Sequence, residues 1–174
     1  MFRQHREKKR KREVGDIHEH LDTLCNLSKE CNHVTEMGVR KIVSTWAFAE
    51  GLQTGGSLIA IDIKEPEEYG VSRGPIERFC KEKGVNFVFV KGDTREIEID
   101  ETDMLFIDTD HFYDQLKKEL ELHSDKARKY LVFHDTVSCE SELMPAINEL
   151  LALGKWKVKD HYKNNNGLMV LERC

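Results

Sequence analysis

The chain contains 174 residues, of which 39% are hydrophobic, 34% are charged and 8% are aromatic. This length and composition are typical of one globular domain with an apolar core, and they exclude a fibrous or low-complexity protein. No apolar run approaches the length of a membrane-spanning helix, and the basic N-terminus lacks the apolar segment of a signal peptide.

Charge is distributed unevenly along the sequence. Seven of the 27 lysine and arginine residues, but only one of the 32 acids, lie in residues 1–12. The rest of the chain therefore holds 20 basic and 31 acidic side chains, a net charge of −11, and is a poor candidate for binding bare nucleic acid. We treat residues 1–15 as a basic N-terminal arm and 16–174 as one domain. The arm is the one segment suited to binding RNA or anionic lipid, although such a composition is more typical of a solvated arm.

The five cysteines are Cys25, Cys31, Cys80, Cys139 and Cys174. Their odd number and the lack of a CxxC pair argue against a disulfide framework and favour a reduced, cytoplasmic setting. The sequence also has no Cys/His ladder with the spacing of structural zinc sites.

Apolar runs and helical periodicities alternate along the chain. Apolar residues at helical spacing begin with Ile17 and end with Leu27, and we take Asp16 as the N-cap of that helix. His18 and His20, two residues apart on this helix, are expected on different faces as surface histidines. Strands are predicted at 34–39, 57–63, 86–90, 104–107, 130–133, 156–162 and 168–171, with further helices at 44–52, 74–83, 112–123 and 141–153.

Five strands separated by helices predict βαβ units and a parallel sheet. The last two strands are joined by an Asn-Asn-Asn-Gly run at 164–167, and these residues tolerate the positive φ of a tight hairpin turn. We therefore predict an α/β, doubly wound, Rossmann-like sheet of seven strands, mostly parallel and closed by a C-terminal antiparallel hairpin.

An acidic residue ends or follows each of the five parallel strands: Glu36, Asp62, Asp93, Asp108 and Asp135. In open α/β sheets, ligands bind at the carboxyl ends of the strands. Carboxylates gathered on one rim repel one another unless a cation or a hydroxyl-rich ligand lies among them. The rim is therefore the predicted ligand site.

Two positions on the rim suit a nucleotide-like cofactor. Gly38 would let the backbone approach a ligand closely, although a simple strand-to-helix turn also explains it and Arg40 stands where a second glycine is expected. Asp62, 24 residues later, is placed to accept both hydroxyls of a ribose. The alternative for Asp62 is a solvated loop acid or the partner of a helix N-terminus.

Two further strand ends suit a metal and a base. If the fourth and fifth strands are neighbours, Asp108 and Asp135 face the same space, and two carboxylates with an imidazole or water can hold Mg²⁺ or Mn²⁺. The spacing of three predicts that His111 lies one helical turn beyond Asp108, where its ordinary pKa suits a general base. The alternatives are that Asp108 caps the next helix and that His134 is a buried structural histidine.

Together, several runs resemble class I S-adenosylmethionine-dependent methyltransferases, nearest to the branch with cephalosporin-hydroxylase-like proteins and macrolide sugar O-methyltransferases. These runs are Glu36-Met-Gly38, Asp62, Gly92-Asp93, Phe106-Ile-Asp108-Thr-Asp-His111 and Phe133-His-Asp135-Thr136. The resemblance implies that Glu36 and Gly38 border the methionine part of the cofactor, that Asp62 binds its ribose and that Asp93 lies near its adenine.

The same resemblance implies that Asp108, His134 and Asp135 bind Mg²⁺ or Mn²⁺ and that His111 is the catalytic base. The implied function is methyl transfer from S-adenosylmethionine, with metal assistance, to a hydroxyl of a sugar or small vicinal diol. One alternative is an S-adenosylmethionine-binding protein of the same fold without turnover. Another is a phosphohydrolase built on Asp108 and Asp110, although that motif belongs on the first strand of its sheet. A small-molecule substrate is the expected partner, and a homo-oligomer is compatible with the sequence.

Overall fold

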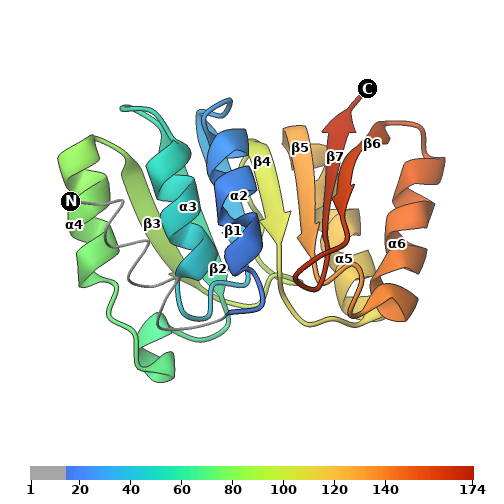
Figure 1. Cartoon of the computed structure of the whole chain (residues 1–174), viewed down its shortest axis with the longest axis horizontal. Helices are drawn as coiled ribbons and strands as arrows, with labels where there is room; N and C mark the ends of the chain where they lie inside the picture. The colour runs from blue at the N-terminus through green and yellow to red at the C-terminus, as the bar shows by residue number, and fades with distance from the viewer. Residues whose placement is uncertain (1–14) are drawn as a thin grey trace.

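Seven strands form one sheet in the order β3-β2-β1-β4-β5-β7-β6 in the computed structural model of the chain, which describes residues 15–174 (Figure 1). The strands are β1 (His33–Met37), β2 (Ser57–Asp62), β3 (Asn86–Lys91), β4 (Thr102–Ile107), β5 (Ala127–His134), β6 (Trp156–Tyr162) and β7 (Leu168–Arg173). Strands β1 to β5 are parallel, and β7 is antiparallel to both β5 and β6. The predicted sheet and its closing hairpin are confirmed, whereas the basic arm lies almost wholly outside the described residues.

Helices cover both faces of this sheet. They are α2 (Leu21–Ser28), α3 (Val43–Gly51), α4 (Gly74–Lys83), α5 (Tyr113–His123) and α6 (Glu140–Ala152), with short 3₁₀ turns η1 (His18–His20), η2 (Pro66–Tyr69) and η3 (Ser124–Lys126). Helices α2, α3 and α4 pack in one hydrophobic core and α5 and α6 in the other. Among residues 15–174, none of the helices has the length and apolar character needed to cross a membrane.

Strand β4 lies in the middle of the sheet and is buried along its whole length. Its side chains alternate between the two cores, so Phe106 packs against Phe48 of α3 while Leu105 faces the core of α5 and α6. A strand buried on both faces reads as a continuous apolar run, which is why 104–107 is apolar without alternation.

The first helix begins differently from the sequence prediction. The chain enters through η1, whose N-cap is Ile17 without a side-chain hydrogen bond, so Asp16 is not the N-cap. Asp16 instead lies 3.7 Å from the guanidinium of Arg40. The prediction of a surface histidine is wrong for His20, which is 1% exposed because the β6–β7 hairpin covers it.

Candidate active site

A cleft of about 730 Å³ lies along the carboxyl ends of the parallel strands. Its size is within the usual range for small-molecule sites, and it includes the ends of β1 and β4, where the strand order changes direction. Six of the eight predicted site residues line it: Gly38, Asp62, Asp93, Asp108, His111 and Asp135. Glu36 and His134 lie behind its wall, where both are buried.

The loop after β1 takes left-handed backbone conformations at three alternate residues. The φ angles are 85° at Gly38, 47° at Arg40 and 53° at Ile42. Left-handed conformation is strained for residues with a side chain, and most of all for a β-branched one such as Ile42. Only Gly38 adopts this conformation without steric cost, so contacts from the rest of the structure must hold Arg40 and Ile42 in it.

Asp62 holds this loop in place. Its Oδ2 accepts hydrogen bonds from the backbone N–H groups of Val39 and Arg40, both at 2.8 Å, and Oδ1 accepts one from Lys64 at 2.9 Å. The carboxylate also lines the cleft, where its remaining acceptor capacity is available to a ligand. The predicted ribose contact would thus come from a side chain that also shapes the neighbouring loop.

Glu36 lies under the cleft rather than on its wall. Its side chain is 0% exposed, Oε1 accepts a short hydrogen bond from Ser44, and Oε2 has no hydrogen-bond partner among residues 15–174. Burial raises the pKa of Glu36 to about 8. Ser44, which the sequence reasoning missed, is the residue of this pair that lines the cleft.

Asp93 lines another part of the cleft and is paired with a neighbour. Its carboxylate lies 2.6 Å from the guanidinium of Arg95, and hydrogen bonds from Arg95 lower the pKa of Asp93. Asp93, which is predicted to lie near the adenine, therefore shares the cleft wall with the positively charged Arg95.

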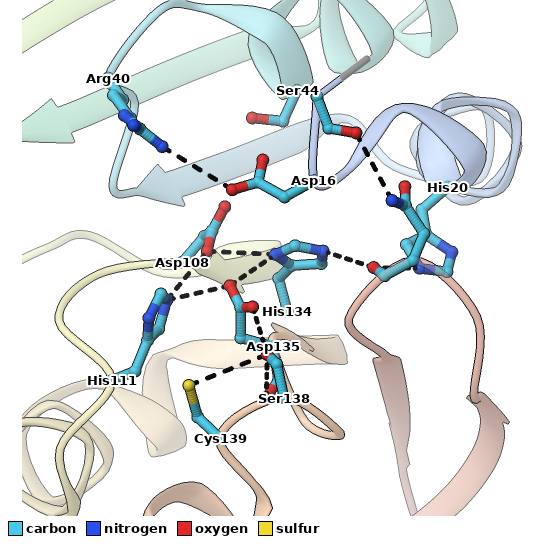
Figure 2. Close-up of polar contacts among 12 residues, drawn as sticks. Asp16, His20, Arg40, Ser44, Asp108, His111, His134, Asp135, Ser138 and Cys139 are labelled. Atoms are coloured by element: carbon cyan, nitrogen blue, oxygen red, sulfur yellow. Dashed lines mark hydrogen bonds and ion pairs between the residues drawn. The ribbon is translucent and has the colours of Figure 1, made fainter.

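Two histidines and two carboxylates form a compact cluster at the ends of β4 and β5 (Figure 2). Nε2 of His111 lies 3.0 Å from Oδ2 of Asp135 and 3.5 Å from Oδ1 of Asp108. Nδ1 of His134 lies 2.9 Å and 3.4 Å from the same two oxygens. The structure thus brings together the four residues that the sequence assigned to a metal and a base.

Residues 108–112 are not helical, so the predicted helical turn between Asp108 and His111 is wrong. Helix α5 begins at Tyr113 with Phe112 as its N-cap, and Asp108 does not cap it. His111 instead reaches Asp135 from the irregular loop between β4 and α5. This leaves its imidazole 38% exposed on the cleft wall.

The charges in the cluster determine its protonation. Contacts with Asp108 and Asp135 raise the pKa of His111 to about 10. Burial opposes this change at His134, but the same carboxylates outweigh it and raise its pKa to about 10. Reciprocally, the histidines lower the pKa of Asp108 and Asp135 despite burial. Without a cation, the cluster is therefore two imidazolium groups paired with two carboxylates.

The β6–β7 hairpin fixes the outer side of His134. Nε2 of His134 donates to the carbonyl oxygen of Asn165 at 3.2 Å, and His20 donates to the same oxygen at 3.2 Å. Positive φ angles at Asn165, Asn166 and Gly167 turn this loop inward. Because Nε2 is engaged, Nδ1 is the nitrogen of His134 that faces the carboxylates. The sequence identified this segment only as a turn.

The same hairpin also forms hydrogen bonds with residues 15–19, at one side of the cleft. The side-chain amide of Asn165 donates to the carbonyl of Gly15 at 3.4 Å, and its Oδ1 accepts from the N–H of Glu19 at 3.0 Å. Gly15 and Asp16 line the cleft, and Figure 2 shows the side chains of Asp16 and Arg40 directed toward each other.

Comparison with solved structures shows that the chain shares its fold with several methyltransferases. No protein-family model matches the chain, and no curated protein matches it. Solved structures do match it. An S-adenosylhomocysteine-bound methyltransferase from Podospora anserina has a TM-score of 0.68 at 12% identity, covering 98% of this chain and 86% of that one. An O-methyltransferase from Bacillus cereus in complex with S-adenosylhomocysteine has a TM-score of 0.63 at 16% identity, covering 90% and 80%. A methyltransferase from Geobacter sulfurreducens has a TM-score of 0.65 at 18% identity, covering 89% and 77%.

Proposed function

We propose that the chain is an S-adenosylmethionine-dependent O-methyltransferase assisted by a divalent cation. The observation that carries this proposal is that one cleft holds both sets of residues that the reaction needs. Gly38 and Asp62 line it, and so do Asp108, His111 and Asp135. A methyl donor and an acceptor oxygen must lie in line and about 3–3.5 Å apart, which one shared cleft allows.

The cofactor would supply the methyl group on a sulfonium. Asp62 would accept hydrogen bonds from its ribose, and Asp93 would lie near its adenine. Gly38 and Ser44 would border its amino-acid part, with Glu36 acting on this part through Ser44. The two S-adenosylhomocysteine complexes of the same fold support this class of cofactor.

The donors at the strand ends fit a divalent cation. One ligand atom each of Asp108, His134 and Asp135 lies within 4.8 Å of the others. Nδ1 of His134 is buried and faces carboxylate oxygens of Asp135 and Asp108 at 2.9 Å and 3.4 Å, so once deprotonated it could bind a cation held between them. One imidazole with two carboxylates suits Mn²⁺ better than Mg²⁺, which prefers oxygen ligands. The cation would lower the pKa of the acceptor hydroxyl.

His111 would be the general base. It stands on the cleft wall, and Asp108 and Asp135 orient its Nε2. An imidazolium cannot accept a proton, so His111 must first lose its own proton, and a cation held by the same carboxylates opposes the charged form. His111 would then take the proton from the acceptor hydroxyl as the methyl group is transferred.

The expected substrate is a hydroxyl of a sugar or another small vicinal diol. Polar side chains on the cleft wall, including Arg40, Asp110 and Gln115, offer hydrogen bonds to a molecule rich in hydroxyl groups. A cytoplasmic setting is part of this proposal, because all five cysteines are free thiols.

One alternative has a structural observation in its favour. The paired charges of His111 and His134 with Asp108 and Asp135 are balanced without any cation, as expected of a cofactor-binding protein that does not catalyse transfer. Calorimetric titration with S-adenosylhomocysteine, followed by a turnover assay with methyl-labelled S-adenosylmethionine and a panel of sugars and diols, separates the two. Binding with Mn²⁺-dependent methylation supports the enzyme. Binding without methylation of any acceptor supports the alternative, and absence of binding refutes both.

A further inference from the structure

A second group of ligand-forming side chains shares Asp135 with the proposed cation site. Sγ of Cys139, a ring nitrogen of His111 and a carboxylate oxygen of Asp135 all lie within 4.8 Å of one another. Figure 2 shows the Cys139 thiol close to Asp135 and on the same side as His111. Cys139 is half-buried and forms no disulfide.

The backbone explains why these three residues meet. The N–H of Cys139 donates to the carbonyl of Asp135 at 2.9 Å, which closes a tight turn at the end of β5. Asp135 has a φ of 58° in this turn, so the chain folds back and places the thiol beside its carboxylate. His111 arrives from the end of β4. Because the ligands come from two strand ends, the group has none of the sequence spacing of a structural zinc site.

The chemistry of the group differs from that of the neighbouring one. Zn²⁺ binds sulfur at about 2.3 Å and nitrogen or oxygen at about 2.0–2.2 Å, so tetrahedral ligands lie roughly 3.3–3.7 Å apart. Small side-chain rotations would bring His111, Asp135 and Cys139 to these distances. A thiolate ligand selects soft or borderline ions such as Zn²⁺ and Cd²⁺ over Mg²⁺ and Mn²⁺.

We infer that His111, Asp135 and Cys139 form a soft-metal site that takes Zn²⁺ or Cd²⁺, and that its occupation inhibits methyl transfer. When the ion binds, the thiol of Cys139 and the imidazolium of His111 each release a proton to solvent, and no redox change occurs. The ion would engage His111, the proposed base, and Asp135, a proposed ligand of the productive cation. The inhibitory part rests on the proposed function, whereas the binding part does not.

Cadmium titration tests the binding part directly, because a cadmium–thiolate bond absorbs in the ultraviolet. The 174-residue chain, without cofactor, should give a saturable signal at one equivalent of Cd²⁺. Cys139→Ser should abolish the signal and weaken Cd²⁺ binding at least about 10–100-fold, the loss typical of disturbing even the outer partners of a metal ligand. Cys174→Ser, which removes the exposed thiol of Cys174, is the matched control and should retain the signal. An unchanged signal in Cys139→Ser overturns the site.

Two further measurements make the outcome decisive. Thermal unfolding of Cys139→Ser without metal should match that of the unsubstituted protein, so that a lost signal reflects a lost ligand, and His111→Ala should also weaken Cd²⁺ binding. In the turnover assay with saturating Mn²⁺, Zn²⁺ should inhibit the unsubstituted protein and inhibit Cys139→Ser at least about 10-fold less strongly. Equal inhibition of both overturns the inhibitory part. Absence of turnover in every protein refutes the proposed function, while the cadmium signal still decides the site.

Discussion

Gly38 and the backbone carbonyl of Asp108 are so close that a Cβ atom on Gly38 would lie 1.9 Å from the carbonyl oxygen. The N–H of Asp108 also donates to the carbonyl of Met37 at 2.8 Å. These contacts join the loop proposed to border the cofactor with the strand end proposed to hold the cation. The relative position of the two parts of the cleft is therefore set by backbone packing.

The first prediction is that Gly38→Ala strongly destabilises the fold. The new methyl group would collide with the carbonyl of Asp108, and the alanine would be strained at the positive φ of this position. The two effects together should lower the free energy of unfolding by about 2–4 kcal/mol. Gly55→Ala is the matched control, because Gly55 has a similar φ of 88° but open space around its Cβ position. Urea unfolding measures both. An equal loss in the two variants would mean that the contact with Asp108 contributes nothing.

The second prediction concerns Glu36 and pH. Its pKa is about 8 in the folded chain against 4.5 for an unperturbed glutamate, so between these values the folded state keeps a proton that the unfolded state has released. The contribution of Glu36 to the free energy of unfolding must therefore fall as pH rises from about 4.5 to 8. Glu36→Gln should remove this dependence and be more stable than the unsubstituted protein at pH 8 by about 2–4 kcal/mol, with little difference near pH 4.5. Parallel pH profiles for the two proteins would show that Glu36 ionises normally.

The third prediction separates the two roles of Asp62. Asp62→Asn keeps an oxygen for the N–H groups of Val39 and Arg40, gives up the bond from the N–H of Lys64, and removes the charge from the proposed ribose contact. Affinity for S-adenosylhomocysteine should fall about 10–150-fold, equivalent to about 1.5–3 kcal/mol. Asp110→Asn, which changes another acid of the cleft, should leave the affinity within about threefold of the original. If calorimetry gives both variants the affinity of the unsubstituted protein, the ribose is bound elsewhere.

The fourth prediction is that His111→Ala loses turnover but keeps the cofactor. A positioned general base typically contributes 10²–10⁴-fold, so kcat should fall by about two orders of magnitude or more while S-adenosylhomocysteine affinity stays nearly unchanged. The deficit should shrink as pH rises, because hydroxide in solution increasingly removes the proton that His111 would take. A loss of less than about tenfold at neutral pH would assign the base to another group.

Much of the fold was predictable because its signals are local. Apolar runs marked the strands, the Asn-Gly segment marked the hairpin, and the order of strands and helices identified a parallel sheet. Neighbouring β4 and β5 then placed Asp108 beside Asp135, so the acidic and histidine residues of the cluster could be named in advance.

The remaining features depend on three-dimensional contacts that helix and strand periodicity does not reveal. His20 is buried because the hairpin turn at Asn165 folds over it, which no local pattern of the first helix reveals. Ser44 lines the cleft while its hydroxyl donates to the buried Glu36, and the turn at Asp135 places the Cys139 thiol beside Asp135 and His111. The only sequence signal that the hairpin turn also contacts His20 and His134 is its run of three asparagines.

A crystal structure with S-adenosylhomocysteine and Mn²⁺, in which anomalous scattering locates the manganese, tests most directly whether one cleft serves both cofactor and cation. We expect the ribose hydroxyls on the carboxylate of Asp62 and the manganese peak among Asp108, His134 and Asp135. A nucleoside bound away from Asp62, or a manganese peak outside those three residues, would contradict the proposed arrangement.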